Sequence, residues 1–259
     1  MKKILIFLFS FFLFNAKAAI VILNGLTHVH KAVKGNTVTG KIVLKNTGKK
    51  DTRIVIYRND LTLPCNGQMS YQNISSHGWS LGDKLKTNVD EKLLLSEEEY
   101  EVTYKIELPS DLEKTGTYYE VIMVESAEPV AEEIREGVKV GSKIRYAVQI
   151  VLDLGDYHHP KVNIENIELK KQADLSKTLN ITLKNNDTYG GVVSISLEIF
   201  DKDNKKIRVF DKIKRRMYPD VCINEDIQIK DLPTGKYEGV IVVDNGKDLI
   251  GSNLTIEIE

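Results

Sequence analysis

Residues 116–125, Gly-Thr-Tyr-Tyr-Glu-Val-Ile-Met-Val-Glu, recur in outline as residues 235–244, Gly-Lys-Tyr-Glu-Gly-Val-Ile-Val-Val-Asp. A Leu-Pro pair precedes the glycine in both copies. A glycine turn, a tyrosine and a β-branched run are typical of a late strand of an immunoglobulin-like sandwich, in which the tyrosine packs inward and its hydroxyl binds nearby backbone. The repeat therefore predicts two such sandwiches, with Tyr118 and Tyr237 as buried structural tyrosines.

The segments around the repeat alternate apolar and polar residues with a period of two. Residues 100–108 and 143–152 show this pattern most clearly, with every second residue apolar. Such alternation is typical of half-buried strands, and no segment shows the period of an amphipathic helix. Short strands separated by Gly, Asn, Asp and Pro predict an all-β fold.

The order of landmarks divides the chain into two related units. Leu-Lys-Asn occurs at residues 44–46 and again at 183–185, in both cases ahead of the tyrosine repeat. We expect a first sandwich over residues 19–153, a linker over 154–160 and a second sandwich over 161–259. The first unit is longer because of an insertion near 60–98, and such an insertion is where a function would be added to a rigid scaffold.

The N-terminus has the features of an export signal. Two lysines precede an apolar run of residues 4–14, and Ala16-Lys17-Ala18 is a small-residue cleavage site. We predict that residues 1–18 are a signal peptide and that the protein acts in the periplasm or at the cell surface. No later apolar stretch is long enough to cross a bilayer, so we expect no transmembrane segment in the mature chain.

Charge and cysteine usage exclude some classes of function. The formal net charge is −1 for 259 residues, which gives no reason to expect nucleic-acid binding. Cys65 and Cys222 lie in different repeats, whereas immunoglobulin domains carry a cysteine pair within one domain. The preferred interpretation is two unbridged thiols, and a bridge between the domains is the alternative.

Several motifs of the first unit resemble a known bacterial family. Gly78-Trp79, the Leu-Pro at 108–109, the run 116–125 and Ile-Arg-Tyr-Ala-Val-Gln-Ile at 144–150 are similar to the first domain of WxL-interacting cell-surface proteins. Arg-Arg-Met-Tyr-Pro at 215–219 resembles the second domain of related proteins. This resemblance implies a partner that is an envelope protein or peptidoglycan, with Trp79 as a candidate binding residue, and it supplies no catalytic residues.

The first unit is also similar to the periplasmic pilus chaperones, which have two immunoglobulin-like (PapD-like) domains. That similarity implies that strand 143–152 could lend its apolar residues to an incomplete pilin-like subunit. The candidate residues are Ile144, Tyr146, Val148 and Ile150. Those chaperones also hold a terminal carboxylate with a basic pair between the domains, for which Arg53 and Arg145 are the conceivable counterparts.

Motifs for catalysis or cofactor binding are lacking in the sequence. His28 and His30 would share one face of a strand, but two histidines without a third ligand are more often surface residues than a metal site. We therefore expect no enzyme activity, no cofactor and no metal. The leading hypothesis is an exported cell-envelope binding or assembly protein, and the alternative is a fimbrial-type periplasmic chaperone that uses strand 143–152.

Overall fold

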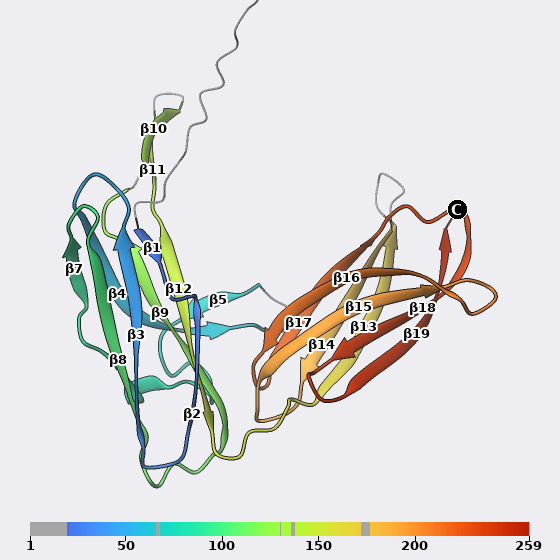
Figure 1. The fold of residues 1–259 in the computed structure, drawn as a ribbon, viewed down its shortest axis with the longest axis horizontal. Coiled ribbons are helices and arrows are strands. Elements are labelled where there is room, and N and C mark those ends of the chain that lie inside the picture. Colours follow the sequence, from blue (N-terminus) through green and yellow to red (C-terminus); the bar gives the residue numbers. More distant parts are fainter. Residues whose placement is uncertain (1–19, 66–67, 130, 136–137, 172–176, 259) are drawn as a thin grey trace, which may run out of the picture.

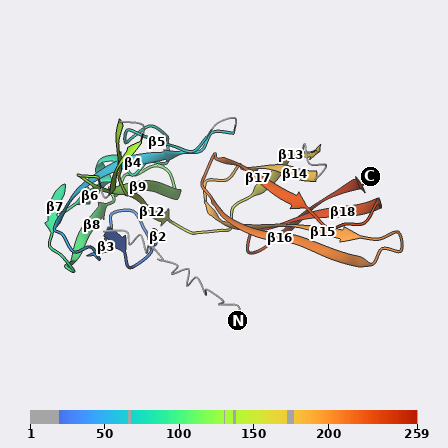
Figure 2. The ribbon, with the colours of Figure 1, turned by 90° about the horizontal axis from the view of Figure 1, so that it is seen from above.

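The computed structural model describes residues 20–258 apart from 66–67, 130, 136–137 and 172–176, so the expected signal peptide lies outside the described residues. Within them the chain is all-β, with a single short 3₁₀ helix at Gly82–Lys84. The strands form two sandwiches, which Figures 1 and 2 show side by side. No helix among the described residues is long and apolar enough to span a membrane.

The first sandwich is built from two sheets that face each other, and all their strand pairs are antiparallel except the parallel pair β2–β12. One sheet has the order β1-β3-β8-β6, and the other has the order β2-β12-β9-β4-β5, with β7 also paired to β4. A separate hairpin, β10-β11, precedes β12 and rises above the sandwich (Figure 1). The strand bounds are β1 Ile20–Ile22, β2 Thr27–Ala32, β3 Thr37–Asn46, β4 Thr52–Thr62, β5 Ser70–Gln72, β6 Leu85–Thr87, β7 Glu91–Leu94, β8 Glu99–Glu107, β9 Gly116–Ser126, β10 Ala131–Arg135, β11 Val138–Ser142 and β12 Arg145–Leu154.

The second sandwich also has two sheets, with the orders β13-β14-β17 and β16-β15-β18-β19. We propose the boundary between the two domains within residues 155–161, because β12 ends at Leu154 and β13 begins at Val162. The strand bounds are β13 Val162–Lys171, β14 Lys177–Asn185, β15 Gly191–Phe200, β16 Lys206–Met217, β17 Cys222–Ile229, β18 Gly235–Asp244 and β19 Leu249–Ile258.

Alternation decides which face of each strand enters the core. In β14 the side chains of Leu179, Ile181 and Leu183 are fully buried, while the residues between them are partly exposed. Successive side chains of a strand point to opposite faces, so this pattern places one apolar row between the two sheets. Each fully buried Leu or Ile contributes roughly 1.5–3 kcal/mol relative to an exposed one.

The repeated tyrosines make the predicted backbone bonds. The Tyr118 hydroxyl donates to the Lys114 carbonyl at 3.0 Å, and the Tyr237 hydroxyl donates to the Pro233 carbonyl at 2.9 Å. Tyr118 is buried, whereas Tyr237 is half-buried and packs against the core, so it is less enclosed than Tyr118. The reason is that β15 pairs with β18 only as far as Glu238, which leaves Tyr237 with β19 as its neighbouring strand.

The interpretation of the two cysteines as unbridged thiols was wrong. Cys65 and Cys222 form a disulfide that joins residues 157 positions apart. Cys222 begins β17 in the second sandwich, whereas Cys65 follows β4 in the insertion of the first. The end of β4 extends towards the second sandwich (Figure 1). The tertiary fold therefore brings together two cysteines that belong to different repeats in the sequence.

Candidate strand-binding edge

Strand β12 is paired unequally on its two sides. It bonds antiparallel to β9 over its whole length, from Arg145 to Leu154. On its other side it pairs with β2 in parallel, but only from Gln149 to Leu154. Among the described residues, no ladder covers this side of β12 from Arg145 to Val148. One part of this edge of β12 is therefore covered by a neighbouring strand, and the other part is open.

The course of the N-terminal segment explains why β2 covers only half of the edge. The segment first pairs with β3 in the opposite sheet, and the N–H of Leu23 still donates to Val43 there at 2.8 Å. Gly25 then takes a positive φ of 88°, a conformation that glycine adopts readily. The Leu26 carbonyl accepts a bond from the Gln149 N–H at 2.8 Å, and β2 begins immediately after it.

Backbone N–H groups of the open stretch, Arg145 to Val148, point to the side of β12 on which β2 lies further along the strand. The N–H groups of Gln149 and Gly155 point to the side of β2, where they donate to Leu26 and Ala32. Backbone groups alternate along a strand, so the N–H groups of Arg145 and Ala147 point to the same side as that of Gln149. They face no partner strand among the described residues, and an unpaired edge of this kind is a template for another strand.

The apolar row of β12 faces the inside of the sandwich. Val148 and Ile150 are fully buried, whereas Ile144 and Tyr146 are partly exposed at the open end of the strand. The Tyr146 hydroxyl donates to the Ile20 carbonyl at 2.7 Å, and burial raises the pKa of this tyrosine. The row is thus core from Val148 onwards, and only its first two members, Ile144 and Tyr146, are accessible beside the open stretch.

The two arginines singled out in the sequence do not meet between the domains. Arg53 pairs with Glu91 at 2.5 Å, and it lies at the end of β4 opposite to the end that leads to Cys65. Arg145 donates to Glu125 at 2.7 Å, and this hydrogen bond is the main cause that lowers the pKa of Glu125. Each arginine is therefore held by its own carboxylate.

Trp79 lies at the contact between the sandwiches and not on an open surface. Its side chain is 7% exposed, and the indole N–H donates to the Asp220 carboxylate of the second sandwich at 2.8 Å. The ring also packs edge-on against Tyr118, with centroids 5.5 Å apart. This location favours a packing role for Trp79.

An aromatic pair that the sequence analysis missed completes this contact. The rings of Tyr119 and Tyr218 stack with centroids 4.0 Å apart, and the Tyr218 hydroxyl donates to Gln149 at 2.6 Å. Tyr119 belongs to the repeat itself, but nothing in its spacing indicates a partner in another domain. A cavity of about 380 Å³ opens beside this pair and is lined by Leu61, Met69 and Arg216 among others.

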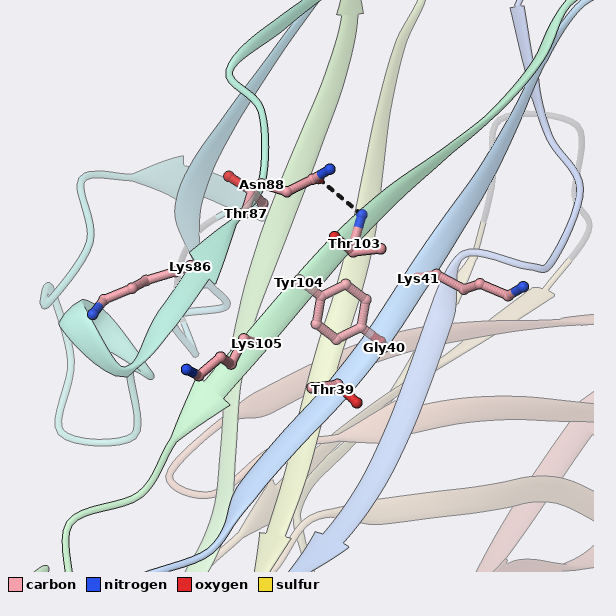
Figure 3. A pocket seen from close by; sticks show the side chains of 9 residues that line it. All are labelled: Thr39, Gly40, Lys41, Lys86, Thr87, Asn88, Thr103, Tyr104 and Lys105. Carbon is pink, nitrogen blue, oxygen red and sulfur yellow. Dashed lines mark hydrogen bonds between the residues drawn. The ribbon is translucent and has the colours of Figure 1, made fainter.

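A second hollow, of about 700 Å³, lies over β3, β8 and β6 (Figure 3). Three lysines line it, and each forms an ion pair with a glutamate: Lys41 with Glu101 at 2.6 Å, Lys86 with Glu107 at 2.9 Å and Lys105 with Glu107 at 2.6 Å. Lys86 and Lys105 share the Glu107 carboxylate, and every one of the three lysines is already engaged in an ion pair.

Comparisons with known proteins give structural neighbours alone. No family model and no curated protein sequence matches the chain. Among solved structures, the class 5 fimbriae chaperone CfaA is 13% identical over 93% of this chain and 99% of its own, with a TM-score of 0.46. A chain of the CsuC-CsuE chaperone-tip adhesion subunit complex of Acinetobacter baumannii is 13% identical over 91% of this chain and 98% of its own, with a TM-score of 0.48. The E. coli chaperone DraB is 8% identical over 92% of this chain and 98% of its own, with a TM-score of 0.41.

All three are chaperones, two of them of fimbriae or pili, so the fold of this chain is similar to that of periplasmic pilus chaperones. At these identities and TM-scores the likeness assigns no function. The resemblance to WxL-interacting proteins stays a prediction.

Proposed function

We propose that this protein is an exported, non-enzymatic assembly chaperone of the periplasm, which holds an extended segment of a pilin-like subunit on the open stretch of β12. The observation that carries the proposal is the end of the β2 ladder at Gln149, which leaves Arg145 to Val148 unpaired on one side within the described chain. This reverses the order of the two hypotheses drawn from the sequence.

The chemistry of the edge fits a strand rather than a compact ligand. A partner strand would accept hydrogen bonds from the N–H groups of Arg145 and Ala147, and its alternate side chains would contact Ile144 and Tyr146. Each such backbone bond contributes a net ~0.5–1.5 kcal/mol. Sequence-tolerant affinity from the backbone, with selectivity from the side chains, suits a protein that receives incompletely folded subunits.

The domain contact supports the proposal because it keeps the second sandwich beside the closed half of β12. The Cys65–Cys222 disulfide and the Tyr119–Tyr218 stack tie the sandwiches together there. The open half is therefore the part of β12 that a partner can approach. An envelope-binding role through Trp79 has less support, because the indole is used inside this contact.

A proline substitution tests the proposal. Proline lacks the N–H, and it is tolerated on an edge strand whose N–H does not serve the ladder. Ala147→Pro should leave the β9 ladder intact and abolish capture of a pilin-like subunit that lacks one strand, in a pull-down from a periplasmic extract. Ala147→Val is the matched control, because it adds a larger side chain but keeps the N–H.

The expected result is loss of capture with Ala147→Pro and retained capture with Ala147→Val, at equal far-ultraviolet circular dichroism. Equal capture by the wild type and both variants would contradict the proposal. So would capture of glycan strands by the wild type in place of a protein subunit.

A further inference from the structure

Strand β19, Leu249–Ile258, forms an edge of the second sandwich. Among the described residues it pairs only with β18, in a register that runs without a shift from Leu249 to Ile258. The side of β19 away from β18 therefore presents a row of backbone N–H and C=O groups that no described strand covers. An edge of this kind can pair with a strand of another molecule.

The turn before β19 shows which backbone groups face the open side. The Asn245 N–H donates to the Asp248 carbonyl at 3.2 Å, so this pair exchanges a bond between the two arms of the hairpin. Because such pairs alternate along an antiparallel ladder, the even-numbered residues of β19 bond to β18 and the odd-numbered ones face outward. The carbonyl of Glu257 fits this assignment, since it accepts a bond from Lys177 in the other sheet. The uncovered stretch of β19 is thus 249–255.

The other edge strands carry features that discourage pairing between molecules, and β19 does not. Short length, charged side chains and bulges are the usual ones. In the first sandwich, β1, β5 and β6 have three residues each, β7 has four and β2 has six. In the second, β13, β16 and β17 all carry charged side chains, and the ladders of β13 and β16 contain register shifts. β19 has ten residues, no register shift, no proline and no charge from Leu249 to Ile256.

The uncovered stretch, Leu-Ile-Gly-Ser-Asn-Leu-Thr, is complementary to itself when two copies run antiparallel about Ser252. Cross-strand pairs of small, polar or apolar residues then face each other, and no charge is left opposite an uncharged side chain. The facing pairs are Ser252 with Ser252, Ile250 with Leu254, Gly251 with Asn253, and Leu249 with Thr255. The outward backbone groups of the odd-numbered residues exchange hydrogen bonds in this register. A charged edge would find no counter-charge on β19, which favours a second copy of the chain as the partner.

Apolar side chains at the edge gain burial from the same pairing. Ile250 and Leu254 pack against the core of the second sandwich but stay partly exposed, whereas Ile256 on the same row is fully buried. Leu249 is 73% exposed on the opposite face of the strand. In the paired sheet Ile250 of one copy covers Leu254 of the other on both sides of the axis, which removes apolar surface from water.

We propose that two copies of this chain associate through antiparallel pairing of β19 with β19, about a two-fold axis at Ser252. The four-stranded sheets of the two copies then form one continuous sheet. Such a contact is isologous, because the same surface is used on both sides. One pair of edge strands buries less than the roughly 1,200 Å² of a standard interface, so the dimer should be weak and depend on protein concentration. The surface lies on β19 and not on β12, so this inference is independent of the proposed chaperone function.

Cysteine cross-linking of the full chain tests the pairing and its register. Facing residues of an antiparallel pair have Cα atoms about 4.5–5.5 Å apart, which is within the range of disulfides. Ser252→Cys should therefore give a covalent dimer on oxidation by dissolved oxygen with copper phenanthroline, resolved by non-reducing electrophoresis. Thr255→Cys is the matched control on the same edge. Its two copies would lie six residues out of register, about 20 Å apart, and should not cross-link faster than by random collision.

Sedimentation over a range of protein concentrations tests association without a cross-link. The wild type should pass from monomer to dimer, and Asn253→Pro should weaken dimerisation about tenfold or more, because each copy loses an outward N–H. Asn253→Thr keeps that N–H and should dimerise as the wild type does. Ala147→Pro on the edge of β12 should also leave dimerisation unchanged. Melting curves establish that each variant is folded, and Gly251→Lys serves if Asn253→Pro is not, since a side chain at Gly251 meets only ordinary contacts.

The proposal is overturned if the wild type stays monomeric up to about 500 µM, a concentration at which even small interfaces associate. It is also overturned if Ser252→Cys cross-links no faster than Thr255→Cys, or if the folded edge variant on β19 dimerises as tightly as the wild type. Loss of the dimer in Ala147→Pro would assign the association to β12 instead.

Discussion

The Tyr218 hydroxyl donates to the Gln149 side chain at 2.6 Å, at the same residue whose backbone N–H donates to Leu26. Gln149 is therefore both the first residue of β12 covered by β2 and the place where the second sandwich is anchored. On one side of this residue the strand is enclosed, and on the other it is free to pair. The division of β12 into two halves thus coincides with the domain contact.

The disulfide should contribute substantially to stability. Cross-linking residues 157 positions apart removes much chain entropy from the unfolded state. We expect Cys65→Ser with Cys222→Ser to lower the free energy of unfolding by about 2–5 kcal/mol. Urea denaturation with and without a thiol reductant measures this.

The reductant is the internal control for that prediction. It should bring the wild type to the stability of the double variant and leave the variant unchanged. A wild type that releases two titratable thiols on unfolding without reductant would contradict the assignment of the bridge.

The two corner tyrosines should differ in their importance. Removing either hydroxyl, by Tyr118→Phe or Tyr237→Phe, loses one backbone hydrogen bond and should cost ~1 kcal/mol. Tyr118→Ala also empties a buried site and should cost about 3–5 kcal/mol. Tyr237→Ala should cost clearly less, because that ring is half-buried. Chemical denaturation compares the four variants, and equal costs for the two alanine substitutions would show that the difference in burial has no effect.

A buried carboxyl should make stability depend on pH. Glu120 is 1% exposed in the first sandwich, and burial raises its pKa to about 7, against a smaller opposing effect of Arg58. The folded state therefore retains a proton that the unfolded state has lost, so stability falls as pH rises from about 4.5 to about 7. The loss from this group is on the order of 3 kcal/mol and is complete above that range.

Glu120→Gln should reduce this slope, measured by urea denaturation at several pH values. Glu107 provides the matched control, because hydrogen bonds and charges from Lys105 and Lys86 lower its pKa to about 2. A group with a lowered pKa stabilises the fold above its unfolded pKa and loses that contribution as pH falls. Glu107→Gln should therefore lower stability by a constant amount above about pH 4.5, with a difference from the wild type that disappears at acidic pH, and should leave the slope between about pH 4.5 and 7 unchanged. An unaltered slope in Glu120→Gln would show that Glu120 is already ionised when buried.

The sequence predicted what depends on local pattern. Alternation over residues 143–152 indicated the strand that the structure places at 145–154, and the tyrosine repeat predicted two hydroxyl-to-backbone bonds. Both follow from the period of a strand and from turn residues close in sequence. The all-β fold was predicted for the same reason.

Contacts between distant parts of the chain were not predictable in this way. The Cys65–Cys222 bridge depends on how far the insertion extends towards the second sandwich, which no spacing reveals. Likewise, the hydrogen bonds of His28 and His30 to the Tyr104 hydroxyl join residues more than 70 positions apart in sequence. The half-covered edge of β12 depends on where β2 starts, and a turn at Gly25 sets that point.

Amide hydrogen exchange of the free protein, resolved to single residues, tests the open edge most directly. The N–H groups of Arg145 and Ala147 should exchange rapidly, because they point to the uncovered side of β12. Those of Gln149 and Val151 should exchange slowly, because β2 covers them. If Arg145 and Ala147 are protected as strongly as Gln149 and Val151, the edge is closed and the proposed strand binding is wrong.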